Sequence, residues 1–77
     1  MNDTYKEIAA LLKQSGYNDL SFVTESVTNR IMYISMYCTA ILLYHKEEKI
    51  KALLHSYDNI IVSGNANLEV IIIKISE

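Results

Sequence analysis

The chain has 77 residues, 51% of them hydrophobic, and a formal net charge of −2. This length predicts a single domain over residues 1–77, because each of two smaller domains would lack a sufficient core. The single cysteine excludes an intrachain disulfide scaffold, and the high apolar content excludes a disordered chain.

The first predicted element is a helix over residues 4–15. Thr4 and Glu7 have the spacing of a capping box, and Gly16 stands where a left-handed C-cap is expected. One face of this helix carries the spacing that is typical of a buried stripe, formed by Tyr5, Ile8, Leu11, Leu12 and Ser15.

Residues 20–26 alternate weakly in polarity and predict a strand with Leu20, Phe22 and Thr24 on one face. A turn over residues 27–30 should follow, in which Asn29 tolerates left-handed geometry.

The next segment, residues 31–44, is rich in β-branched and aromatic side chains. A single strand over residues 30–45 would extend roughly 50 Å, which exceeds the width of so small a domain. We therefore expect a bend or turn near residues 37–39. The segment then forms two strands, one strongly coiled strand, or a strand followed by the start of a helix.

The second helix is marked by a stripe at Ile50, Leu53, Leu54 and Tyr57. One turn earlier the stripe meets Lys46 and Glu47, which are polar. We therefore expect the helix to begin near residues 45–46, and we disfavour the alternative of a helix over residues 39–57. Glu47 and Lys51 have the spacing of a favourable i,i+4 ion pair.

The C-terminal segment predicts a hairpin, with strands at residues 59–63 and 68–75 and a loop at residues 64–67. The last strand is apolar on both faces, so it lies at the centre of a sheet or in an interface. The order α-β-β(-β)-α-β-β predicts an α+β two-layer sandwich, in which two helices cover a mainly antiparallel sheet of four or five strands.

Three residues are candidates for chemistry: Cys38, His45 and His55. A zinc site needs three or four ligands, and the spacing of these residues does not provide them. A lone cysteine is usually a small buried apolar residue, and two glycines are too few for a phosphate-binding loop. We therefore predict no catalytic residue, no cofactor and no metal ion, and we expect that the protein is not an enzyme.

Nucleic-acid and membrane partners are not expected either. The lysines at positions 46, 49 and 51 are interleaved with glutamates, which is typical of a solvated helix face. The longest uncharged stretch, residues 31–44, is shorter than the roughly 20 residues that a spanning helix needs. The start of the chain has no signal-peptide pattern. Together with the lone thiol, this predicts a cytoplasmic location.

Tyrosine is the most suggestive residue type, with six copies against one phenylalanine and no tryptophan. Tyrosine suits surfaces that are partly dry and partly wet, and it is a common hot-spot residue of interfaces. In a regular strand Met32, Ile34 and Met36 would face the core, and the tyrosines between them would face outward. The alternative is that the tyrosines only cover the solvent side of the sheet. The predicted interface residues are Tyr33, Ser35, Tyr37, Tyr44, Ile71 and Ile73.

A mean hydropathy of +0.12 is high for so small a domain, which exposes proportionally more surface. We therefore predict a non-catalytic protein-interaction module, a regulator, inhibitor or adaptor that self-associates as a homodimer or covers a protein partner. In size and composition the chain is similar to small proteins of phages and mobile elements, several of which block host enzymes. The alternatives are a subunit of a ligand-binding or enzymatic assembly with a site between protomers, and a weak nucleic-acid-binding protein.

Overall fold

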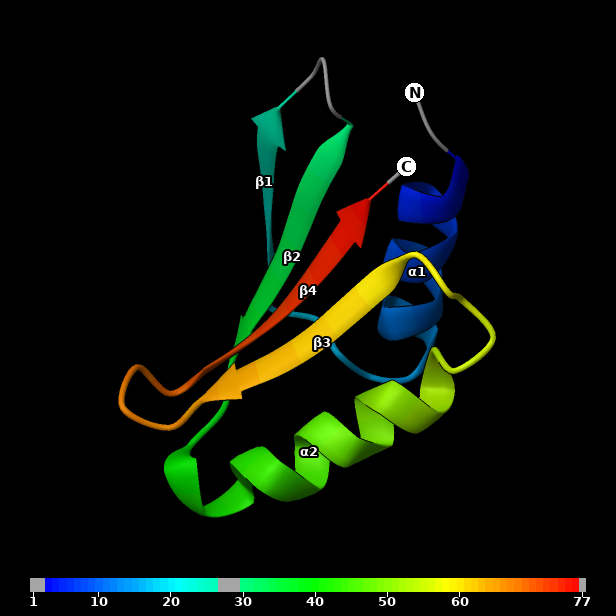
Figure 1. Cartoon of the computed structure of the whole chain (residues 1–77). Helices are drawn as coiled ribbons and strands as arrows, with labels where there is room; N and C mark the ends of the chain where they lie inside the picture. The colour runs from blue at the N-terminus through cyan, green and yellow to red at the C-terminus, as the bar shows by residue number, and fades with distance from the viewer. Residues whose placement is uncertain (1–2, 27–29, 77) are drawn as a thin grey trace.

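The computed structural model describes residues 3–26 and 30–76, which form two helices and a four-stranded sheet. The helices are α1 (Asp3–Gln14) and α2 (Ala40–Leu53), and the strands are β1 (Leu20–Ser26), β2 (Ile31–Tyr37), β3 (Ile60–Asn65) and β4 (Val70–Ser76). The strand order is β1-β2-β4-β3, and every neighbouring pair is antiparallel. Both helices lie on one side of the sheet (Figure 1). The predicted α+β sandwich is confirmed, with four strands in the described part of the chain.

Helix α1 ends as the sequence predicts, at a left-handed glycine. Gly16 has φ +96°, and its N–H donates to the carbonyl of Lys13 at 3.1 Å. The N–H of Tyr17 donates to the carbonyl of Leu12 at 3.0 Å. These two bonds form a Schellman motif, which turns the chain sharply toward β1.

The N-terminal end of α1 differs from the prediction. The helix already includes Asp3, so Thr4 lies inside the first turn instead of at the cap. The carboxylate of Glu7 accepts a hydrogen bond from the hydroxyl of Tyr57 at 3.1 Å. Glu7 therefore links α1 to the segment that follows α2.

The first two strands form a hairpin with the predicted bounds for β1. The register shifts between Thr24 and Ser26, where β1 has an extra residue. The predicted turn residues 27–29, including Asn29, lie outside the described residues. Arg30, just before β2, has the left-handed φ of 55°.

Residues 31–44 form a strand followed by the start of a helix. Strand β2 ends at Tyr37, and helix α2 begins at Ala40. The alternatives of two strands or one coiled strand are therefore wrong, and so is the predicted helix start near residues 45–46.

The reason for the early helix start lies in Lys46 and Glu47. Both are half-buried on the stripe of α2 that faces the sheet. The Lys46 ammonium lies 5.7 Å from the ring centroid of Tyr17, and the Glu47 carboxylate pairs with Lys51 at 3.0 Å. Long charged side chains can cover apolar surface with their stems while their heads find polar partners. Because these two side chains are polar, the sequence pattern did not indicate that the helix continues through them.

The turn of the C-terminal hairpin lies two residues later than predicted, because β3 continues through Gly64 to Asn65. A Cβ atom at Gly64 would lie 2.6 Å from Oε1 of Glu47 and 3.0 Å from Cδ2 of Leu43. The glycine thus permits the close approach of α2 to β3. It was predicted as a turn residue.

The hairpin turn is attached to the start of α2 by Glu69, which has a left-handed φ of 51°. Its carbonyl accepts the N–H of Cys38 at 2.9 Å, and its carboxylate accepts the N–H of Ala40 at 2.9 Å. The side chain of Thr39, the N-cap residue, makes no capping bond. Glu69 therefore supplies the cap of α2 from a distant part of the chain.

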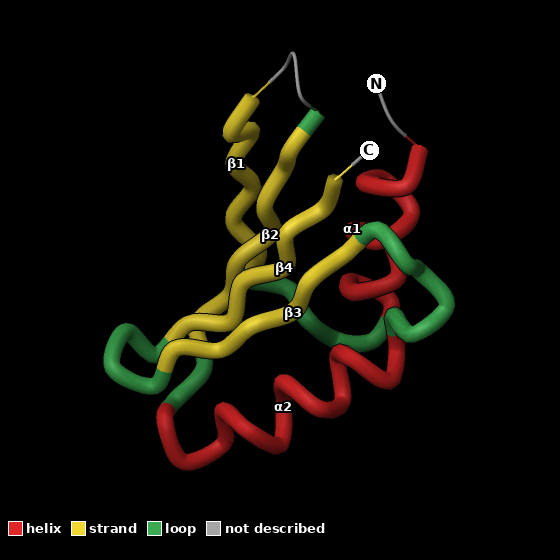
Figure 2. Tube along the Cα trace, viewed as in Figure 1, coloured by secondary structure: helices red, strands yellow, loops and turns green. Residues whose placement is uncertain are grey.

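The core fills the space between the sheet and the two helices. Met32, Ile34 and Met36 face it, as the alternation of β2 predicts. Strand β4 is central, with β2 and β3 on either side (Figure 2). The largest fully buried side chains are Ile8, Leu12, Ile34, Ile50, Leu54, Ile71, Ile73 and Ile75.

Candidate interaction surfaces

The face of the sheet opposite the helices, here called the open face, is not covered by any described part of the chain (Figures 1 and 2). Alternation along the strands places on it the apolar or aromatic residues Val23, Ile31, Tyr33, Tyr37, Ile61, Val70 and Ile72. The small polar residues there are Ser21, Ser35, Ser63, Asn65 and Ser76. Lys74 is the one charged residue among these described positions, although 21% of the whole chain is charged. Such depletion of charge is typical of the core of a protein interface.

The strand register orders the open face into rows that cross the sheet. The central row consists of Ser21, Ser35, Ile72 and Ser63. The row on one side of it contains Val23, Tyr33, Lys74 and Ile61, and the row on the other side contains Tyr37, Val70 and Asn65. The serines therefore leave the middle of the face low between two rows of larger side chains.

Three of the predicted interface residues lie together on the open face. Tyr33 and Ser35 are half-buried, and Tyr37 is 83% exposed at the end of β2. Burial that alternates along β2 shows that they point away from the helices.

Two other predicted interface residues, Ile71 and Ile73, are fully buried beneath the helices. They belong to the core and cannot contribute to a surface, so this part of the prediction needs correction. The residue between them, Ile72, faces outward instead. The sequence could not assign these faces, because isoleucine stands on both sides of β4.

Tyr44, the last predicted interface residue, lies on α2 and not on the sheet. It is 74% exposed, beside Ile41 at 94% and Leu42 at 55%. We call these three residues the helix patch. They lie in the helix layer, so the helix patch is separate from the open face. Ile41 and Leu42 are not among the predicted interface residues, because the second helix was expected to begin only near residues 45–46.

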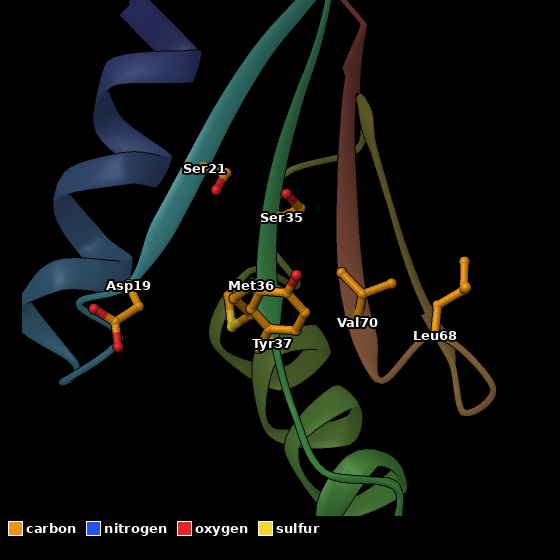
Figure 3. A pocket seen from close by; sticks show the side chains of 7 residues that line it. All are labelled: Asp19, Ser21, Ser35, Met36, Tyr37, Leu68 and Val70. Atoms are coloured by element: carbon orange, nitrogen blue, oxygen red, sulfur yellow. The ribbon is translucent and has the colours of Figure 1, made fainter.

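A shallow depression of about 320 Å³ lies at one end of the open face. Its lining combines the carboxylate of Asp19, several hydroxyl groups and apolar side chains (Figure 3). The lining residues are Asp19, Ser21, Ser35, Met36, Tyr37, Leu68 and Val70. This combination is suited to a cationic side chain with an apolar stem.

The candidates for chemistry are dispersed. Cys38 is buried, with its thiol 3.5 Å from the carbonyl of Thr39. His45 is exposed on α2, and Nδ1 of His55 lies 2.9 Å from the carbonyl of Ala52. From His45 to the end of α2 at Leu53 the helix rises about 12 Å, and His55 lies beyond that end, so the two histidines are too far apart to share a metal ion. The described residues include no group of three or more potential metal ligands.

Lys51 of α2 is paired with two glutamates of the same helix. Lys51 lies 3.0 Å from Glu47 and 3.5 Å from Glu48. The hydrogen bond that the Lys51 ammonium donates to Glu47 is the main reason why the pKa of Lys51 lies above its ordinary 10.5. The predicted i,i+4 pair is confirmed, and this lysine is not available as an isolated positive charge.

Comparison of the chain with protein-family models, with curated proteins and with solved structures gives no match. Neither helix, over the residues that the structure describes, has the length and apolar character needed to cross a membrane.

Proposed function

We propose that this protein is a non-catalytic protein-interaction module that self-associates and acts as a regulator, inhibitor or adaptor by covering a protein partner. Its size and composition favour an origin in a phage or mobile element, where the protein blocks a host protein.

The observation that carries the proposal is the charge-depleted open face. A sheet face that only meets water normally has many charged side chains, because alternation places polar residues on the solvated side. Here the described positions carry one lysine amid aliphatic and tyrosine side chains. Exposed apolar surface of this extent is typical of interaction sites.

The two surfaces differ in what they offer. The open face is broad and shallow, and it is built on four hydrogen-bonded strands. The helix patch is small and projects from the first turns of α2, whose N-terminus is anchored by Glu69. A self-associating module can therefore use one surface for its own copy and the other for its target.

The alternative of nucleic-acid binding has less support. Lys51 is paired with two glutamates, and Lys46 lies over the ring of Tyr17. A phosphate backbone would have to compete with these contacts.

Affinity capture from the native host tests the proposal, with three variants that each add one lysine. Ile72→Lys alters the open face, Ile41→Lys alters the helix patch, and Ala10→Lys is the control on an exposed position of α1. Circular dichroism first shows that each variant is folded.

We expect at least one captured protein to be lost with Ile72→Lys or Ile41→Lys and retained with Ala10→Lys. If both surface variants remain folded and capture the same proteins as the native chain, the proposed function is wrong.

A further inference from the structure

We propose that the open face binds a second copy of this chain, face to face, and that Lys74 of each copy enters the depression of the other and reaches toward Asp19. This inference rests on the self-association in the proposed function and specifies its geometry. The two copies are related by a twofold axis that lies between the sheets, along the central row.

The symmetry follows from the order of the rows. A twofold axis along the central row, at right angles to the strands, reverses the strand direction of the second copy. The row that contains Lys74 then lies over the row that contains Tyr37 and Val70 of the other copy. A twofold interface needs a surface that complements itself, and every contact then occurs twice.

Charge complementarity selects this arrangement. Lys74 lies in one outer row, and Asp19 lies at the opposite end of the face, where it lines the depression. Neither residue forms an ion pair within the described part of the chain. In the reversed second copy Lys74 lies over Val70 of β4, and its extended side chain crosses β2 to reach toward Asp19 beside β1, about two strand spacings away.

The depression is also suited to the rest of a lysine side chain. Val70 and Leu68 provide apolar contacts for the stem, and the ring of Tyr37 provides a face for the ammonium. The hydroxyl groups of Ser21 and Ser35 can accept its remaining hydrogen bonds. These side chains surround the cavity in Figure 3.

The central row permits the close approach that this packing needs. Sheets that pack face to face lie about 10 Å apart. The serines at positions 21, 35 and 63 leave room at the axis, and Ile72 meets its own counterpart there. The apolar contact at the centre is therefore surrounded by small polar groups.

The area of the open face is sufficient for a dimer of modest stability. Four strands about 4.8 Å apart and about six residues long cover a flat area of about 400 Å². Protruding side chains add accessible surface to this flat area, so the face approaches the roughly 800 Å² per partner of a standard interface from below. The helix patch lies in the other layer, so the dimer leaves it accessible to a different protein.

Sedimentation equilibrium of the full chain, from about 1 µM to about 500 µM, tests the proposal, because this range covers the weak self-association of transient interfaces at the low end of the size range. The variants are Lys74→Glu, Asp19→Lys and the double variant that exchanges the two charges. Lys49→Glu, which makes the same charge change on the exposed side of α2, is the matched control.

We expect the native chain to dimerise, and each single charge reversal to weaken the dimer at least about tenfold, since each places two like-charged contacts in the interface. The double variant should recover most of the lost affinity, and Lys49→Glu should behave like the native chain.

Three results would overturn the inference: a native chain that stays monomeric throughout, a double variant that is no better than the single variants, or a dimer that Ile41→Lys disrupts and Lys74→Glu does not. A monomeric chain that still loses a captured protein with Ile72→Lys refutes only the dimer. A dimer with the expected charge dependence but no protein lost with either surface variant refutes only the regulatory function.

Discussion

Two neighbouring isoleucines of β4, Ile72 and Ile73, test the assignment of the two sheet faces. They have the same chemistry and adjacent positions, but Ile73 is fully buried against the helices and Ile72 is half-buried on the open face. Replacing each by alanine removes the same three carbon atoms. Any difference between the two losses of unfolding free energy therefore reports on the burial of the two side chains.

The magnitudes follow from the structure. At Ile73 the loss of three buried carbons costs about 2.4 kcal/mol in transfer free energy. A residual cavity of about 40 Å³ adds about 1 kcal/mol, so we expect Ile73→Ala to cost about 3.5 kcal/mol. At Ile72 the truncated site opens to water and leaves no cavity, so we expect Ile72→Ala to cost about 1.5 kcal/mol in the monomer.

Urea unfolding followed by circular dichroism measures both free energies, at a protein concentration low enough to exclude self-association. A domain of this length has a total stability of about 4–12 kcal/mol. Ile73→Ala should therefore lower Tm by roughly 15–25 °C, and Ile72→Ala by less than half as much. If the two substitutions cost the same, or Ile72→Ala costs more, the assignment of the faces is wrong.

Three further substitutions probe contacts between distant parts of the chain. Gly64→Ala should destabilise the fold by about 1 kcal/mol in urea unfolding, because its Cβ would lie 3.0 Å from Cδ2 of Leu43 and overpack the contact between α2 and β3; an increase in stability would contradict this. Glu69→Ala should lower the free energy of unfolding by about 1 kcal/mol in thermal unfolding, because α2 loses its cap. Glu69→Gln keeps an acceptor oxygen and should cost less than half as much. Equal losses would show that the acceptor oxygen of Glu69 does not stabilise α2. Burial and the hydrogen bond to Glu7 raise the pKa of Tyr57 above its ordinary 10.0. The protonated phenol therefore stabilises the fold fully below about pH 10. This stabilisation is lost as the pH rises through the raised pKa. Tyr57→Phe should therefore show a smaller fall in Tm between about pH 9 and about pH 11 than the native chain, and parallel curves would contradict the role of this phenol.

Local patterns were sufficient wherever a short segment decides its own conformation. The glycine at position 16 predicts the end of α1, because only a residue without a side chain adopts its φ of +96° at low cost. The bounds of β1 and the inward face of β2 also follow from alternation. Each of these features depends on neighbours within a few residues.

Sequence patterns gave wrong predictions where a side chain has two possible environments in the fold. Lys46 and Glu47 interrupted the apolar stripe of α2, because the sequence does not show that their stems can lie on the sheet while Tyr17 and Lys51 meet their charges. Gly64 was assigned to a turn, because the approach of Leu43 comes from a helix twenty residues earlier.

The element types, most of their order and the apolar excess of this protein follow from its amino-acid sequence. The place of that excess depends on how the helices pack against the sheet. This packing places Ile71 and Ile73 beneath the helices and leaves Ile72 on the open face. The physical reason is that β4 is apolar on both sides, so its own alternation cannot select a face. That choice is made by two helices that cover one side of the sheet, and by strand pairing that brings Lys74 and Tyr33 together on the other.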